Sequence, residues 1–204
     1  IDRASNAPVG ALDRDYGLDA AGNAQHAAAF VEGLRAAGVG AAAKHFPGLG
    51  AVTGNTDFTT DGIVDTTTTR NGPEVQAFAQ AIRAADPGMV MISLATYTAI
   101  DPDEPAAFSP TVIDGMLRGD IGYGGVVISD SLSASAVSAI APAELGVRLV
   151  QAGGDLACVN DPAFTQPILD GLRARARGDA AFAERVTQSA RRVVSLKLAL
   201  GLAQ

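Results

Sequence analysis

Apolar and polar residues along this chain follow two patterns, the 3.6-residue period of helices and the short continuous apolar runs of buried strands. Residues 19–37 predict a helix, since Asp19 can cap its start and Gly38 can end it. The apolar run at 88–95 predicts a strand that is buried on both faces. The same reasoning gives the full series of expected elements: strands at 39–45, 88–95, 125–129 and 155–159, and helices at 19–37, 73–85, 110–118, 142–152, 162–175 and 180–200.

Strands and helices therefore alternate, which indicates an α/β protein with a parallel sheet covered by helices. Candidate polar residues lie where strands end, with Lys44 and His45 at the end of one strand and Asp130 after another. The carboxyl ends of parallel strands form the ligand site in (β/α)8 barrels and in open doubly wound sheets alike. The connection at 46–72 is long for a compact domain and rich in Gly and Thr, so we expect it to be an active-site loop.

Charge and composition exclude several classes of protein. The chain has 15 Lys and Arg against 22 Asp and Glu, a net charge of −7, which argues against nucleic-acid binding because phosphate contacts need clustered basic residues. No apolar run approaches the roughly 20 residues of a membrane-spanning helix. With one cysteine, Cys158, and two histidines, His26 and His45, the sequence has neither an intrachain disulfide nor a metal-site spacing. We expect Cys158 to be a small buried apolar residue of its strand.

Two motifs resemble those of a known family. Residues 44–50, Lys-His-Phe-Pro-Gly-Leu-Gly, are similar to the KHFPGxG motif of the β-N-acetylglucosaminidase branch of glycoside hydrolase family 3. Residues 126–132, Val-Val-Ile-Ser-Asp-Ser-Leu, are similar to the VVISDxL motif of that branch. The glucosidase branch usually has Trp after the aspartate, whereas Ser131 follows here, which favours the hexosaminidase branch.

The resemblance covers nearly the entire chain. It implies an α/β fold of the (β/α)8 TIM-barrel type and a retaining hydrolase that removes terminal N-acetyl-β-D-glucosamine from peptidoglycan fragments or chitooligosaccharides. The reaction of such enzymes passes through a covalent glycosyl-enzyme. The resemblance implies a carbohydrate as the partner and no metal or organic cofactor.

The same resemblance assigns roles residue by residue. Asp130 matches the nucleophile, which must be an ionised carboxylate facing the anomeric carbon, and its alternative is a cap for the following turn. Lys44 and His45 match residues that hydrogen-bond the sugar hydroxyls, and their alternative is a buried ion pair or a core histidine. Arg14, in the stretch Asp-Arg-Asp-Tyr-Gly, resembles an arginine that reaches the sugar subsite, although two neighbours differ from the family pattern. The alternative for Arg14 is a surface salt bridge with a neighbouring Asp.

The acid/base group departs from the family pattern, in which a loop histidine is oriented by an aspartate. Here Leu49 stands for the first motif histidine, Asn55 for the orienting aspartate and Asp57 for the catalytic histidine. Asp57 could instead act as a carboxylic acid that protonates the leaving oxygen and then activates water, as in most retaining glycosidases. The alternatives are that Asp57 makes an Asx-turn, or that Asp61 or Asp65 holds the role. A carboxylate acid/base disfavours phosphorolysis, because it repels phosphate.

The chain length sets a further expectation, because a complete (β/α)8 barrel takes about 250 residues. Residues 1–204 are expected to be a single, N-terminally incomplete barrel domain that covers about the C-terminal five strand-helix units. Missing N-terminal strands or a second copy would complete the fold, since a cut barrel exposes strand edges. Similar Gly-Asn-Thr-Asp sequences in secreted or lipoprotein members from actinobacteria indicate a secreted or cell-envelope location, with the cytoplasm as the alternative. The alternative function is a catalytically inactive sugar-binding remnant or module of this family.

Overall fold

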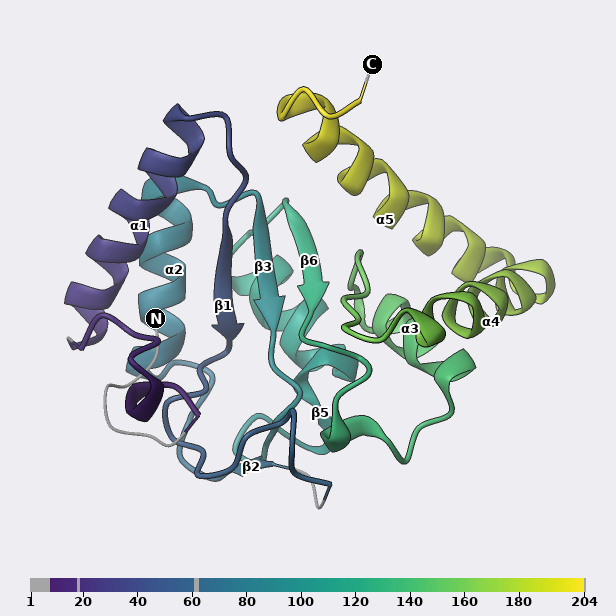
Figure 1. Cartoon of the computed structure of the whole chain (residues 1–204), viewed down its shortest axis with the longest axis horizontal. Coiled ribbons are helices and arrows are strands. Elements are labelled where there is room, and N and C mark those ends of the chain that lie inside the picture. The colour runs from purple at the N-terminus through teal and green to yellow at the C-terminus, as the bar shows by residue number, and fades with distance from the viewer. Residues whose placement is uncertain (1–7, 18, 61–62, 204) are drawn as a thin grey trace.

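A parallel sheet of three strands organises the computed structural model, which describes residues 8–17, 19–60 and 63–203. Its order is β1-β3-β6, with β1 at Ala42–Phe46, β3 at Met89–Ile92 and β6 at Val126–Ser129 (Figure 1). Strands that follow one another through a helical crossover are therefore neighbours, as in the barrel that the sequence predicts. The α/β class and the first three expected strands are confirmed.

The fourth expected strand, at 155–159, is wrong as a regular strand. Within the described residues, its one bridge to the sheet joins Leu156 to Ile128 of β6. A side chain then replaces the main chain as hydrogen-bond partner, because Ser129 Oγ accepts from Cys158 N at 3.0 Å. The segment therefore runs beside β6 without forming a continuous ladder.

The helices follow the expected capping and periodicity. The first, α1 (Ala20–Ala36), begins at Asp19, whose carboxylate accepts from Gly22 N at 2.8 Å, and α2 (Pro73–Ala85) begins with a proline. The helix expected at 110–118 forms at η3 (Thr111–Asp120), where it is a π-helix with more residues per turn than an α-helix. The remaining helices are α3 (Pro142–Ala152), α4 (Thr165–Gly178) and α5 (Ala180–Ala199), and short 3-10 turns lie at η1 (Gly10–Leu12), η2 (Ala106–Phe108), η4 (Ser135–Val137) and η5 (Pro162–Phe164).

A smaller sheet lies beyond the carboxyl ends of the main strands (Figure 1). It has the order β2-β4-β5, with β2 at Val64–Asp65, β4 at Thr96–Tyr97 and β5 at Asp101–Pro105. The sequence pattern does not predict these strands, because β2 and β4 have two residues each, too few to show a hydrophobic period, and β5 is Asp-Pro-Asp-Glu-Pro, which has no apolar alternation. The buried Tyr97 hydroxyl donates to Gly48 O at 2.7 Å, so this sheet fixes the loop that follows β1.

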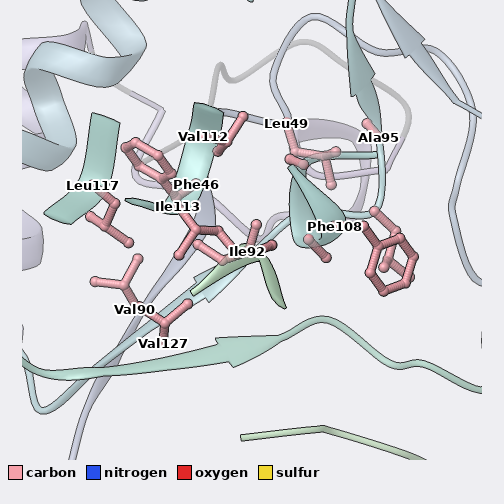
Figure 2. Packing of buried hydrophobic residues seen from close by; sticks show 14 of the residues in the cluster. Phe46, Leu49, Val90, Ile92, Ala95, Phe108, Val112, Ile113, Leu117 and Val127 are labelled. Atoms are coloured by element: carbon pink, nitrogen blue, oxygen red, sulfur yellow. The ribbon is translucent and has the colours of Figure 1, made fainter. Parts of the chain in front are cut away.

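The two faces of the main sheet differ in burial. Val90 and Val127 are 0% exposed and pack into the same apolar cluster as Phe46 (Figure 2). Successive side chains of a strand point to opposite faces, and the next positions along these strands, Met91 and Ile128, are only half-buried. The core therefore sits between the sheet and its helices, while the opposite face is more open.

A buried charge network joins β6 to α5. The Asp155 side chain is 0% exposed, and its carboxylate contacts Arg118 Nη2 at 2.6 Å, Arg192 Nη1 at 3.0 Å and Val127 N at 2.8 Å. Burial lowers the pKa of the Arg118 guanidinium, and the charge of Asp155 opposes this effect. Because Arg192 belongs to α5 and Val127 to β6, one carboxylate holds the last helix against the sheet.

We expect Asp155→Ala to lower the free energy of unfolding by about 3–5 kcal/mol, because it leaves the buried Arg118 charge without this partner. Urea denaturation followed by circular dichroism measures the loss. The matched control is Asp170→Ala, which removes an exposed contact to Arg173 at 3.5 Å and is expected to cost less than about 1 kcal/mol. Equal losses in the two variants would contradict the role given to Asp155.

Candidate active site

The carboxyl ends of β1 and β6 bring three of the expected site residues together. Lys44 and His45 are the third and fourth of the five residues of β1, and Asp130 directly follows β6. His45 Nε2 lies 3.8 Å from Asp130 Oδ2. The His45 side chain is 5% exposed and that of Asp130 is 18% exposed, so a ligand reaches the carboxylate more easily than the imidazole.

Asp130 is oriented on both sides. Its main-chain N donates to Ile92 O of β3 at 2.9 Å, and its Oδ1 accepts from Ser131 N at 2.8 Å. The Ser131 contact is the local side-chain to backbone bond of the capping alternative. The other oxygen, Oδ2, faces His45 across the sheet. Asp130 thus combines a local contact with a second one across the strand ends, which leaves its carboxylate in a defined direction.

Cys158 belongs to the same electrostatic neighbourhood. Burial and the charge of Asp130 raise the pKa of the Cys158 thiol, and the charge of Lys44 lowers it. The thiol is half-buried, so the expectation of a simple buried apolar residue is only partly met. Hydrogen bonds explain this position, because Cys158 N donates to Ser129 Oγ at 3.0 Å and Cys158 O accepts from Leu132 N at 2.8 Å, which places Cys158 beside the segment that contains Asp130.

Arg14 lies in the N-terminal segment before α1. Its Nη1 donates to Pro8 O at 2.9 Å, and its side chain lies exposed. Arg14 and Lys44 both line a cavity of about 390 Å³, together with Tyr16 and Phe30. Neither His45 nor Asp130 lines this cavity, so the sugar-binding role of Arg14 stays a prediction.

The loop carboxylates differ sharply in environment. Asp65 is 1% exposed, and its carboxylate accepts from the main-chain N of Thr67 and of Thr68 at 2.7 Å each. These bonds occupy Asp65 in a turn next to β2 and make it a poor proton donor to a ligand. Asp61 lies outside the described residues. Asp57 is exposed, and the Asx-turn of this loop is made by Asn55, whose Oδ1 accepts from Asp57 N at 2.9 Å.

The loop that carries Asp57 is joined to the segment after Asp130. Asp57 O accepts from Ser135 N at 3.4 Å, and Thr56 O accepts from Ala136 N at 3.1 Å. Both acceptors belong to the predicted active-site loop, and both donors lie within six residues of Asp130 along the chain. The main chain therefore keeps Asp57 on the same side of the sheet as the candidate nucleophile.

Ser133 is a structural residue of the site that the sequence reasoning missed. Its hydroxyl accepts from Asn160 N at 3.1 Å and from Asp161 N at 3.3 Å, contacts Ser131 Oγ at 3.0 Å and donates to Asn160 Oδ1. It thus ties the turn after Asp130 to the loop after Cys158. A serine in a Ser-rich stretch carries no sequence signal for this role.

No group of three or more His, Cys, Asp and Glu side chains in the described residues could hold a metal ion. In that same part of the chain, no helix is long and apolar enough to cross a bilayer. The polar groups at the strand ends are a carboxylate, an imidazole and an amine, which suit proton transfer and hydrogen bonding to a polyol.

Comparison with known proteins identifies the family. The model of the glycosyl hydrolase family 3 N-terminal domain matches residues 1–196. The chain belongs to this family. The resemblance drawn from the two strand-end motifs is therefore confirmed, and the relatives below also support the hexosaminidase branch.

A curated protein from Tolumonas auensis, named beta-hexosaminidase, is 34% identical over 182 residues, which cover 85% of this chain and 51% of the relative. The crystal structure of a beta-N-acetylhexosaminidase from Beutenbergia cavernae is 43% identical with a TM-score of 0.92, over 96% of this chain and 60% of that one. A family 3 beta-N-acetylglucosaminidase from Paenibacillus is 30% identical with a TM-score of 0.87, over 98% of this chain and 38% of that one. The chain thus spans about half the length of the curated relatives it matches.

We expect Asp130→Asn to speed alkylation of Cys158 by about two- to fivefold at fixed pH. The reason is that one partly solvated charge changes the free energy of thiol ionisation by on the order of 1 kcal/mol. The sign follows from the thiolate being the reactive form. Removing the Asp130 charge lowers the Cys158 pKa and raises the thiolate fraction. Lys44→Met is expected to slow the reaction. Iodoacetamide kinetics followed by intact mass measure both changes. Unchanged rates in both variants would contradict the claim that the charges of Asp130 and Lys44 act on the Cys158 thiol.

Proposed function

We propose that the protein is a retaining β-N-acetylhexosaminidase in which Asp130 is the nucleophile. The observation that carries this proposal is the meeting of Asp130 and His45, 3.8 Å apart, at the carboxyl ends of parallel strands. That is where (β/α)8 enzymes place their chemistry. The names of the relatives from Tolumonas auensis and Beutenbergia cavernae support the substrate class.

The proposed reaction has two displacements. Asp130 Oδ2 attacks the anomeric carbon while the bond to the leaving oxygen breaks, and Asp57 gives its proton to that oxygen. Water then attacks the same carbon from the vacated side, Asp57 takes the proton of the water, and the bond between the sugar and Asp130 breaks. Each step inverts the configuration, so the product retains the β anomer.

The cationic groups are proposed to hold the terminal sugar. Lys44 offers an ammonium with three N–H donors, Arg14 a guanidinium with five, and His45 one switchable donor, which suits a ring of hydroxyl groups. His45 also faces Asp130, so it can orient the carboxylate and a sugar hydroxyl together. Leu49, which is 3% exposed, stands where the family motif has its first histidine. No ionisable side chain is therefore present at this position.

The natural substrates are proposed to be peptidoglycan fragments or chitooligosaccharides that end in N-acetyl-β-D-glucosamine. A secreted or cell-envelope location, with the cytoplasm as the alternative, is proposed on the likeness of the Gly-Asn-Thr-Asp stretch to secreted actinobacterial members. Detection of the protein in culture medium, membrane and cytosolic fractions with a specific antibody tests the location.

We expect Asp130→Ala to lower kcat on 4-nitrophenyl N-acetyl-β-glucosaminide at least about 10³-fold, because it removes the carboxylate that is proposed to form the glycosyl-enzyme. A 2-fluoro glycoside is expected to label the wild-type protein once, on the peptide that contains Asp130. The exposed Asp170→Ala variant serves as the control and keeps full activity. Reversible sugar binding without turnover or labelling would instead favour the inactive sugar-binding module.

We expect Asp57→Ala to slow hydrolysis of N,N′-diacetylchitobiose by about 10²–10⁴-fold, because its sugar leaving group needs a proton. For the 4-nitrophenyl glycoside, the rate of the first displacement is expected to fall less, since nitrophenolate leaves without being protonated. Added azide is expected to restore turnover and give the β-glycosyl azide, detected by mass spectrometry. Full activity of the variant on chitobiose would exclude Asp57 as the acid/base.

A further inference from the structure

The loop of Asp57 carries an unusual side chain at its tip. Phe58 is 82% exposed, the highest value for a large apolar side chain in ranges 8–17, 19–60 and 63–203. Phenylalanine carries a large apolar area that normally leaves water on folding. An aromatic ring left in solvent beside a candidate catalytic carboxylate therefore suggests contact with a ligand.

The turn holds Phe58 in a fixed place. Its main-chain N donates to Asn55 O at 3.1 Å, and Thr59 N donates to the same oxygen at 3.0 Å. Thr56, two residues before, is 3% exposed and bonded through its carbonyl to Ala136. The base of the turn is thus anchored in the protein while the ring is exposed, so a ligand that covers the ring need not order the main chain of the turn.

The position of Asp57 defines which part of a substrate Phe58 would meet. The general acid protonates the leaving oxygen, so it stands beside the leaving group and not beside the sugar that becomes attached to Asp130. Phe58 follows Asp57 directly, on the loop that lies beyond the carboxyl ends of the strands (Figure 1). It therefore belongs to the leaving-group side of the site.

We propose that Phe58 is the stacking platform for the leaving-group sugar and makes the protein selective for substrates whose leaving group is a second pyranose. A β-linked N-acetylglucosamine ring has C–H bonds on both faces, because its substituents are equatorial. Such a face matches the negative face of an aromatic ring. This inference rests on the proposed function and adds a preference for oligosaccharides over glycosides with small or peptide leaving groups.

The test compares two substrates that share the terminal sugar. N,N′-Diacetylchitobiose has a sugar leaving group, whereas N-acetyl-β-glucosaminyl fluoride has a leaving group without a ring. We expect Phe58→Ala to lower kcat/KM for chitobiose by about threefold to tenfold, through KM. Turnover of the fluoride is expected to stay within about twofold. Phe58→Tyr keeps the ring and is expected to hydrolyse chitobiose with a kcat/KM close to that of the wild type.

Leu198→Ala is the matched control, because Leu198 is 50% exposed on α5 and far along the chain from the loop. It is expected to change neither substrate. Equal losses on both substrates in Phe58→Ala, or no loss on either, would overturn the platform. If the wild type turns over neither substrate, the proposed function fails. Calorimetric titration of chitobiose into wild type and Phe58→Ala then decides the platform, since equal affinities overturn it and a threefold or larger loss supports it.

Discussion

Parallel pairing of β1, β3 and β6 is the constraint on which the rest of this structure depends. The register aligns Phe46 with Ile92 and Ile92 with Ser129, so three strands end in one row. His45 precedes this row and Asp130 follows it, which is why residues 85 positions apart along the chain lie at one edge of the sheet. Apolar packing against helices holds the row in place, since Ile92 is 0% exposed and belongs to the same cluster as Phe78 of α2 and Ile113 of η3.

The sequence predicts those elements whose signals are local. Both bounds of α2 and α3 match the expectation, because each begins with a proline in the first turn and continues with apolar residues at helical spacing. The strand expected at 155–159 does not form, because its partner on β6 offers the Ser129 hydroxyl where a ladder would use a carbonyl. Which group completes a hydrogen bond depends on the neighbouring segment, and a single-segment pattern contains no such information.

The candidate site divides in the same way. Lys44, His45 and Asp130 could be found because strand ends are predictable and parallel strands bring their carboxyl ends together. Ranking the loop carboxylates needed the fold. Asp65 resembles Asp57 in the sequence, yet its carboxylate accepts hydrogen bonds from the hydroxyl and the main-chain N of Thr68 and is thereby held in a turn. The contribution of Ser133 depends on the loop at 160–161, which meets it only in the folded chain.

The loop after β1 has a buried base and an exposed tip. Its base is part of the core, since Leu49 and Val52 are 3% and 1% exposed and Gly48 O accepts from the Tyr97 hydroxyl. Its tip is held out in solvent by main-chain bonds to the segment after Asp130. Leu49 packs in the main apolar cluster, so no ionisable side chain stands at that position of the base. Asp57, the proposed acid/base, lies at this tip, so a substitution there changes the proposed proton donor and leaves the packed base of the loop unchanged.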